Sequence, residues 1–267
     1  MKELIVRSIS GILYISIVIF SMFASREWFI ALFLGLGWIT LYEFLKLIDI
    51  KSYVSYALLP VFLYFFSYDI FDQNAVLVLL ILACFVNLFL FRDLLVVHRI
   101  PLFENKKYIL ILFYIITGFV FITLIPFKNG AFEPYLIIAV FIMIWANDTF
   151  AYLVGKNFGK RKLMERVSPK KTVEGFLGGL LGTVTMSFLI FDYTQLYSLK
   201  VWIIMAVIVT FLGTLGDLIQ SKVKRQAGVK DSGSLMPGHG GIYDRLDSIV
   251  YTSPFIYAFL QLVDYVS

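Results

Sequence analysis

The chain has 267 residues, of which 60% are hydrophobic, 18% aromatic and only 15% charged, with a formal net charge of +5. Soluble proteins carry about 25% charged residues, and no polar stretch here is long enough to form a soluble domain. Together with a mean hydropathy of +0.86, these numbers indicate a polytopic membrane protein. The single cysteine, Cys84, excludes disulfides within the chain and CxxC metal sites.

The apolar stretches between charges have about the length of a membrane-spanning helix, which is ~20 residues. We therefore expect an all-α fold with about nine transmembrane helices. The first stretch resembles a signal peptide, but the many spans after it favour an uncleaved helix. In chain order the predicted spans are residues 8–25, 28–47, 53–68, 74–91, 108–126, 135–154, 175–191, 201–218 and 249–266.

Two regions differ in what lies between these spans. Residues 1–130 contain about five spans and no recognisable motif. Residues 131–267 contain about four spans and two polar loops on the same side of the membrane. We expect the second region to be catalytic.

The basic residues are distributed unequally between the two sides. An odd number of spans puts the termini on opposite sides, and loops on the N-terminal side then hold 20 of the 23 lysines and arginines. Only Arg26, Lys128 and Lys200 lie opposite. By the positive-inside rule the side that holds most of the lysines and arginines is cytoplasmic. We expect a multi-pass protein of the inner (plasma) membrane whose positive charge meets lipid headgroups and not nucleic acid.

The first polar loop, residues 155–174, ends in the sequence SPKKT just before the seventh span. Ser168 is a candidate helix cap, and Pro169 suits a first helical position. Lys170 and Lys171 would then stand at a helix N-terminus, which favours an anion such as phosphate. The alternative is that these lysines only enforce topology or touch lipid headgroups.

The second polar loop, residues 217–247, is rich in both charges and contains the turn GHGG. Asp244 and Asp247 share one face if they are helical, and Asp217 lies across the loop. Asp148 is similarly placed in the sixth span, where a central Asp costs about 2.5–3.5 kcal/mol and therefore indicates function. Such acids can hold one or two cations; the alternative is structural salt bridges with the nearby lysines and arginines.

Two further features of this loop stay open at this point. His239 is a candidate general base or metal ligand, or a donor that fixes the loop. Lys224 and Arg225 can bind either nucleotide phosphates or an acidic lipid headgroup.

The segment from Ser221 to Asp247 closely resembles the signature of the phosphatidate cytidylyltransferases, also called CDP-diacylglycerol synthases. That signature has a serine, a Lys-Arg pair, a Lys-Asp pair, an HGG and a closing Asp-Arg-x-Asp. SPKKTVEG and NDTFAYLVG resemble the family's other polar motifs, so the likeness covers about the C-terminal half. One departure is Met236, where the family usually has Ile, Leu or Phe.

The resemblance implies a nucleotidyltransferase of phospholipid biosynthesis, which converts CTP and phosphatidic acid into CDP-diacylglycerol and pyrophosphate. The lipid phosphate attacks the α-phosphorus of CTP directly, with an active site at the cytoplasmic face of the bilayer. The implied cofactor is Mg²⁺, with a second cation and a homodimer left open. The implied metal ligands are Asp217 and Asp244, supported by Asp148 and Asp247; the catalytic group adds Lys224, Arg225, Lys230, Asp231, His239 and Arg245; substrate binding falls to Ser168, Lys170, Lys171, Thr172, Glu174, Ser221, Lys222, Gly240 and Gly241.

Other functions compete with this interpretation. A CTP-dependent lipid kinase, or a cytidylyltransferase for another lipid phosphate, would reuse the same nucleotide chemistry. A transporter or flippase for anionic lipids would need polar groups near the bilayer midplane and a route to the far side. The far side is almost uncharged, which disfavours transport.

Overall fold

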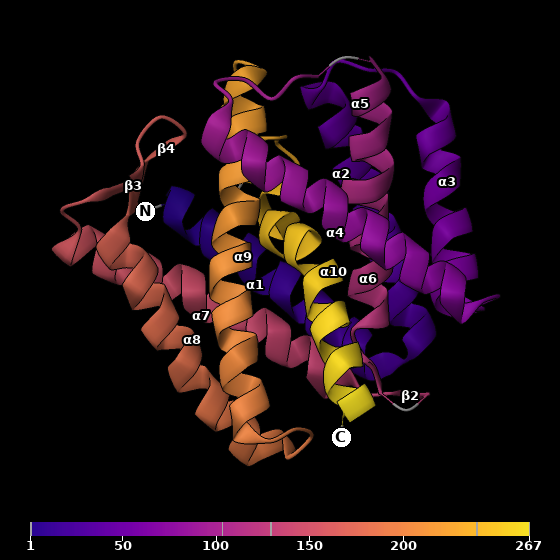
Figure 1. The fold of residues 1–267 in the computed structure, drawn as a ribbon. Coiled ribbons are helices and arrows are strands. Elements are labelled where there is room, and N and C mark those ends of the chain that lie inside the picture. Colours follow the sequence, from indigo (N-terminus) through magenta and orange to yellow (C-terminus); the bar gives the residue numbers. More distant parts are fainter. Residues whose placement is uncertain (1, 103, 129, 239, 267) are drawn as a thin grey trace.

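A computed structural model describes residues 2–102, 104–128, 130–238 and 240–266. Within these residues the protein is a bundle of long helices with two small β-hairpins (Figure 1). The hairpins pair β1 (Phe127–Lys128) with β2 (Ala131–Phe132) and β3 (Lys162–Met164) with β4 (Ser168–Thr172). The helices are α1 (Lys2–Ala24), α2 (Arg26–Leu47), α3 (Tyr53–Leu63), α4 (Gln73–Val96), α5 (Glu104–Leu110), α6 (Thr117–Leu124), α7 (Pro134–Phe158), α8 (Val173–Thr194), α9 (Leu199–Gln226) and α10 (Tyr243–Val266).

This architecture confirms the predicted class, an all-α polytopic membrane protein. Each predicted span falls on a helical segment of the described chain, and π-helical turns at Tyr64–Tyr68 and Ile111–Ile116 continue α3 and join α5 to α6. Among the described residues, 7 helices are long and apolar enough to cross a membrane, and two apolar helices, Ile9–Ala24 and Tyr53–Tyr68, are shorter. The number of helices that cross therefore stays a prediction.

Helices α7, α9 and α10 extend beyond the predicted spans and carry polar residues that the sequence assigned to loops. α9 continues past Leu218 to Gln226, and α10 begins at Tyr243, well before the predicted start at Ile249. Hydropathy marks only the apolar part of a helix, whereas its backbone hydrogen bonds continue into polar surroundings. The signature residues on α9 and α10 are therefore held on rigid helical turns.

The prediction that Ser168 caps a helix and that Pro169 begins it is wrong. Ser168–Thr172 forms β4, which pairs antiparallel with β3. A residue that precedes proline is driven toward extended backbone, which favours a strand at Ser168. The cap is Thr172, whose hydroxyl accepts a hydrogen bond from the Gly175 N–H at 3.0 Å, so the helix begins after the two lysines.

Contacts among the loops gather at two ends of the bundle. Arg26, at the start of α2, donates to the carbonyl of Ser67 at 2.7 Å, and Lys128 donates to the carbonyl of Leu196 at 2.5 Å. These contacts join the turns that follow α1, α3, α6 and α8. Arg26 and Lys128 are two of the three basic residues predicted on the side that is poor in lysine and arginine. Both bind backbone carbonyls, and the Arg26 guanidinium lies over the ring of Phe127, next to Lys128, so they share one end of the bundle.

At the other end of α2, the remaining loops meet. Lys107 donates to the carbonyl of Asp49 at 3.3 Å, and Arg166 donates to the carbonyl of Leu94 at 3.0 Å. These contacts place the segments after α2, α4 and α7 together. Which end faces the cytoplasm stays a prediction.

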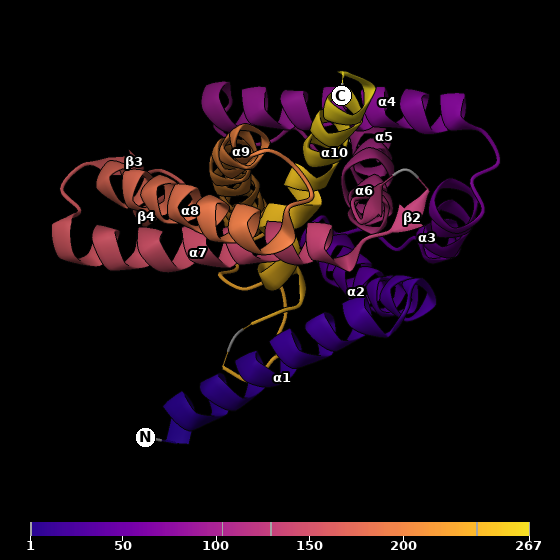
Figure 2. The same cartoon turned by 90° about the horizontal axis from the view of Figure 1, so that it is seen from below.

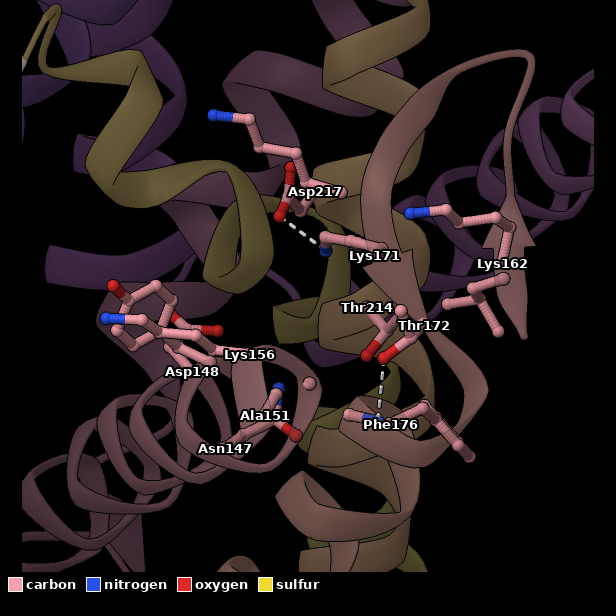
Figure 3. Close-up of a pocket in the computed structure, with 15 residues that line it drawn as sticks. Asn147, Asp148, Ala151, Lys156, Lys162, Lys171, Thr172, Phe176, Thr214 and Asp217 are labelled. Carbon is pink, nitrogen blue, oxygen red and sulfur yellow. Dashed lines mark hydrogen bonds and ion pairs between the residues drawn. The ribbon is translucent and has the colours of Figure 1, made fainter. Parts of the chain in front are cut away.

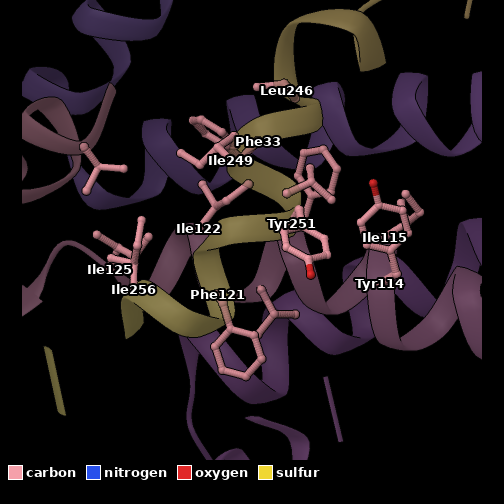
Figure 4. Packing of buried hydrophobic residues seen from close by; sticks show 14 of the residues in the cluster. Phe33, Tyr114, Ile115, Phe121, Ile122, Ile125, Leu246, Ile249, Tyr251 and Ile256 are labelled. Atoms are coloured by element: carbon pink, nitrogen blue, oxygen red, sulfur yellow. The ribbon is translucent and has the colours of Figure 1, made fainter. Parts of the chain in front are cut away.

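One buried apolar cluster runs through both sequence regions (Figure 4). Phe121 and Ile122 of α6 pack in it with Ile249 and Ile256 of α10, and Phe33 of α2 joins them. α10 therefore packs inside helices of the N-terminal region and not only against α9. In contrast, α1 runs away from the body of the bundle (Figure 2).

Glycines on α8 let it lie against α7. A Cβ at Gly178 would come within 2.5 Å of Val154, and one at Gly182 would come within 2.4 Å of Phe150. Larger residues would push the two helices apart, which is the packing role that small residues have in membrane proteins. This close pairing positions the C-terminal end of α7 against the N-terminal end of α8.

Candidate active site

A cavity of about 620 Å³ lies between α7, α8, α9 and the β3–β4 hairpin (Figure 3). Three distant segments supply its charged lining: Asp148 comes from α7, Lys171 from β4 and Asp217 from α9. The lining consists of Asn147, Asp148, Ala151, Tyr152, Gly155, Lys156, Lys162, Leu163, Lys170, Lys171, Thr172, Gly175, Phe176, Thr214 and Asp217.

An ion pair between Lys171 and Asp217 stands at the centre of this cavity (Figure 3). The second carboxylate oxygen of Asp217 accepts a hydrogen bond from Ser221 Oγ at 3.1 Å. Burial alone would lower the pKa of Lys171, but the carboxylates of Asp217 and Asp148 outweigh it and raise that pKa above its ordinary value. Lys171 is therefore a fixed positive charge. Its side chain is 28% exposed and that of Asp217 is 32% exposed, so both remain accessible from the cavity.

Asp148 and Asp247 add negative charge beside this pair. Asp148 interacts electrostatically with Lys171 and Asp217, and Asp247 interacts with Asp217 and Asp148. The structure thus brings together three of the four acids predicted from the sequence. Within the described part of the chain, no group of three or more His, Cys, Asp or Glu residues forms a ready-made metal site. Lys171 already supplies a positive charge among these acids, and Lys224 and Arg245 also interact with them electrostatically.

Further lysines line the same cavity. Lys156 lies in the last turn of α7, Lys162 on β3 and Lys170 on β4, and all three side chains are exposed. Lys170 and Lys171 thus occupy a strand and not the predicted helix N-terminus, yet both still line the cavity. The sequence analysis did not single out Lys156 and Lys162; their position in the same basic loop was the available signal. A cavity lined by several lysines and by the carboxylates of Asp148 and Asp217 suits a polyphosphate that is bound together with a cation.

Asp244, in contrast, is engaged with the protein on both of its oxygens. Oδ1 accepts hydrogen bonds from Lys224 Nζ at 2.6 Å and Gln220 Nε2 at 3.0 Å. Oδ2 accepts from the backbone N–H groups of Ser232 and Gly241, both at 2.9 Å. The side chains of Lys224 and Asp244 are only 10% and 8% exposed. Asp244 therefore anchors the α9–α10 loop, residues 227–242.

Asp217 and Asp244 nevertheless lie near each other. Asp217 interacts electrostatically with Lys224, the same lysine that pairs with Asp244. The partly exposed carboxylate of Asp217 and the buried carboxylate of Asp244 thus both interact with one ammonium group. Both acids belong to the same end of the bundle, as the sequence analysis requires.

The sequence analysis missed the second anchor of the loop, Glu43 on α2. Glu43 is 3% exposed, and its carboxylate accepts hydrogen bonds from Ser232 Oγ at 2.7 Å, Ile242 N–H at 3.1 Å and Tyr243 N–H at 2.9 Å. Its partners are about 200 residues away in sequence, so no local pattern pointed to it. The only signal was an acid within an otherwise apolar span.

Lys222, predicted to bind substrate, lies outside the cavity. It is 4% exposed, and its ammonium group donates to the carbonyls of Asp93 and Val97 at 2.5 and 2.6 Å. These carbonyls end α4, where the helix itself offers no N–H partners. In this structure Lys222 joins α9 to the C-terminal end of α4.

Glu174 and Arg225 likewise contact the protein backbone. The Glu174 carboxylate accepts from the N–H groups of Lys160 and Arg161 at 3.0 and 3.1 Å, which holds the turn between α7 and β3. Arg225 donates to the carbonyl of Val229 at 2.9 Å and closes the end of α9. Neither residue lines the cavity.

The glycines of the GHGG turn come close to the protein's own carboxylates. Gly240 has a φ of +85°, and a Cβ there would lie 2.7 Å from Asp244 Oδ2. Arg245, at the start of α10, interacts electrostatically with Asp148. His239 lies outside the described residues, so its predicted roles stay open. The other predicted site residues, Ser168, Lys230 and Asp231, are half-buried or exposed near these elements.

Comparison with known proteins extends the likeness over nearly the whole chain. A sequence model of the cytidylyltransferase family matches residues 5–263. The phosphatidate cytidylyltransferase of Bacillus subtilis is 33% identical over 265 residues, which cover 96% of this chain and 97% of the relative. The phosphatidate cytidylyltransferases of Haemophilus influenzae and Staphylococcus aureus are each 40% identical, over 163 and 145 residues; these cover 54% of this chain in both cases and 57% and 54% of the relatives.

Proposed function

The chain belongs to the cytidylyltransferase family, and from that premise we propose that its cavity is where CTP and phosphatidic acid react. The enzyme is a nucleotidyltransferase of phospholipid biosynthesis, which produces CDP-diacylglycerol and pyrophosphate. The observation that carries the site assignment is the Lys171–Asp217 ion pair, which lies in a lysine-lined cavity.

The reaction needs no nucleophilic side chain. An oxygen of the lipid phosphate attacks the α-phosphorus of CTP, and a new P–O bond forms. The bond from that phosphorus to the bridging oxygen of the β-phosphate breaks, and pyrophosphate leaves with the electron pair. Phosphoryl and nucleotidyl transfers of this kind depend on positioning and on charge stabilisation.

The lysines of the cavity would supply much of that stabilisation. Lys171 is held protonated by its acidic neighbours, so it can face phosphate oxygens without losing its charge. Lys156, Lys162 and Lys170 are exposed at the same cavity and can neutralise the triphosphate. Asp217 orients Lys171 by the ion pair between them.

Magnesium is the cofactor we propose for this site. Mg²⁺ takes oxygen ligands and uses few protein carboxylates, leaving its other positions to water and phosphate. The residues fit, because Asp148 and Asp217 present carboxylates to the cavity and Asp247 lies beside them. When bound, the ion would neutralise phosphate oxygens of CTP. Asp244, predicted as a ligand, would have to give up one of its four hydrogen bonds to join it.

We further propose that the cavity opens at the cytoplasmic face of the inner membrane. The cavity lies at the end of the bundle where the segments richest in lysine and arginine meet, and the positive-inside rule supports a cytoplasmic position. The acyl chains of phosphatidic acid would remain in the bilayer. Whether the protein forms a homodimer and whether a second cation binds both stay open.

Transfer of label tests this function. Purified protein in detergent micelles receives phosphatidic acid and CTP labelled at either the α- or the γ-phosphate, with and without magnesium. We expect label in the lipid only from the α-position and only with the metal. Lipid labelled from the γ-position would indicate a kinase, and turnover that persists after magnesium removal by chelation would contradict the proposed cofactor.

A further inference from the structure

Glu43 connects the N-terminal region to the signature loop. It stands near the C-terminal end of α2, and its side chain is 3% exposed. Ile242 N–H donates to one oxygen at 3.1 Å, while Tyr243 N–H and Ser232 Oγ donate to the other at 2.9 and 2.7 Å. All three partners belong to the loop or to the first residue of α10.

The position of this carboxylate has a direct physical reason. The first N–H groups of a helix have no partner within the helix, and an anion at a helix N-terminus is stabilised by the helix dipole. Ile242 and Tyr243 provide such N–H groups at the start of α10. Glu43 therefore caps α10 from a different helix, in place of a local Ser, Thr or Asp.

Two glycines make room for it. A Cβ at Gly233 would lie 2.3 Å from Glu43 Oε1, and a Cβ at Gly241 would lie 2.3 Å from Glu43 Oε2. The loop therefore closes around the carboxylate on two sides. A buried carboxylate is costly unless its oxygens are hydrogen-bonded, and this enclosure supplies the donors.

A second carboxylate, that of Asp244, also accepts hydrogen bonds from this loop. Ser232 joins the two, because its backbone N–H donates to Asp244 and its hydroxyl donates to Glu43. Gly241 N–H donates to Asp244, and the next residue, Ile242, donates to Glu43. The two carboxylates thus tie the middle of the loop, at Ser232, to its last residues, Gly241 and Ile242.

We propose that Glu43 is a positioning residue for cytidylyl transfer. By capping α10 and closing the loop, it sets the place of the first turns of α10, which carry Asp244 and Asp247. Asp247 in turn interacts with Asp148 and Asp217 of the cavity. This inference rests on the proposed function, and it assigns a role in the reaction to a region in which the sequence shows no motif.

Glu43→Gln is the central variant. An amide keeps the size of the side chain but replaces one acceptor oxygen with an NH₂ group, which must face one of the three donors. Displacement of reacting groups by about 1 Å can cost 10²-fold in rate, so we expect kcat to fall by about 10- to 100-fold. We expect the KM values for CTP and phosphatidic acid to change less than about threefold, because the cavity lysines are untouched.

Glu43→Asp and Thr40→Val complete the set. Asp keeps the charge but is shorter, so it should lose less activity than Gln. Thr40 lies one turn before Glu43 on α2, is fully buried and has no hydrogen-bond partner for its hydroxyl. Thr40→Val therefore controls for a change in the buried part of the same helix, and we expect wild-type kinetics from it.

Backbone hydrogen exchange gives a readout that does not depend on activity. In Glu43→Gln the amides of Ile242 and Tyr243 should exchange at least about tenfold faster than in wild type, because their acceptor is weakened. Thr40→Val should leave this exchange unchanged. Both measurements are made on folded, monodisperse protein in the same detergent, and Glu43→Asp replaces the Gln variant if the latter does not fold.

The outcomes separate clearly. Wild-type kcat in Glu43→Gln, or unchanged exchange at Ile242 and Tyr243, would overturn the proposal. A loss of activity that only follows the unfolded fraction would also overturn it. An inactive wild-type protein would instead contradict the proposed function, while the exchange measurement would still decide whether Glu43 holds the loop.

Discussion

The cavity around Asp217 and the loop around Asp244 use the same chemical group in opposite ways. Asp217 has one hydroxyl and one lysine as partners and remains 32% exposed. Asp244 has four hydrogen-bond donors and is 8% exposed. Both acids belong to the second polar loop of the sequence, residues 217–247, and both interact with one lysine, Lys224.

This difference teaches that one polar loop mixes residues for chemistry with residues for architecture. A carboxylate whose oxygens are only partly occupied can take a cation or orient a reacting lysine. A carboxylate with saturated oxygens holds backbone in place. Counting the donors around each acid separates the two roles, whereas its position in the polar loop does not.

The strongest test of the comparison is Asp244→Asn. Removing one charge of a buried ion pair leaves Lys224 without its partner and costs about 3–5 kcal/mol. We expect a large drop in the thermal unfolding midpoint and in the yield of folded protein. Asp264→Asn, near the other end of the same helix, is the control, because the amide oxygen can still accept the hydrogen bond from the Tyr197 hydroxyl. Wild-type stability of Asp244→Asn would show that the loop does not depend on this carboxylate.

Asp217→Asn should give the opposite result. An amide oxygen can still accept from Ser221, so the fold should persist. The orientation of Lys171 and the proposed metal ligand are lost, and loss of one such electrostatic group costs about 10²–10³-fold in kcat. CTP turnover with phosphatidic acid, measured beside the unfolding midpoint, checks this. Near-normal turnover would remove Asp217 from the catalytic group.

Lys222→Met tests whether Lys222, which lies in the same polar loop, stabilises the fold and does not bind substrate. The variant keeps the apolar stem but leaves the carbonyls at the end of α4 without their donor, at about 1–3 kcal/mol. We expect lower thermal stability, with kcat and the KM for CTP of the folded fraction within about twofold of wild type. Lys200→Met, at an exposed position, is the matched control. A raised KM for CTP in Lys222→Met would restore Lys222 to the substrate site.

Lys170→Ala should have the smallest effect. An exposed charge interaction contributes up to about 1 kcal/mol, so the KM for CTP should rise by at most about fivefold, and less at high salt. Lys160→Ala removes a neighbouring charge that does not line the cavity. Equal effects of the two variants would mean that only the net charge of the loop matters.

Much of the fold could be predicted because hydrophobic spans are a strong, local signal. The positions of the helices, the class of protein and the end at which the polar loops meet followed from runs of apolar residues and from the distribution of lysine and arginine. Helix ends were less predictable: α9 continues through Lys222 and Lys224, and Pro169 lies in a strand. Hydropathy does not detect helical turns that leave the apolar layer.

The site could be predicted only in part. The polar pattern of the sequence pointed to Asp148, Asp217 and Lys171, which the structure brings together. It gave no way to tell that Lys222 faces the backbone of α4, since a lysine in a polar segment looks the same whichever way it points. The role of Glu43 could not be predicted because its hydrogen-bond partners lie about 200 residues away in the sequence.

The sequence by itself determined that this protein spans a membrane and belongs among enzymes that join a nucleotide to a lipid phosphate, because apolar runs and closely spaced polar motifs are local properties. Only the tertiary structure decided which carboxylates remain accessible in the cavity and which are saturated with hydrogen bonds from the protein. That distinction depends on how many donors surround each carboxylate, and most of those donors come from helices and loops far away in the chain.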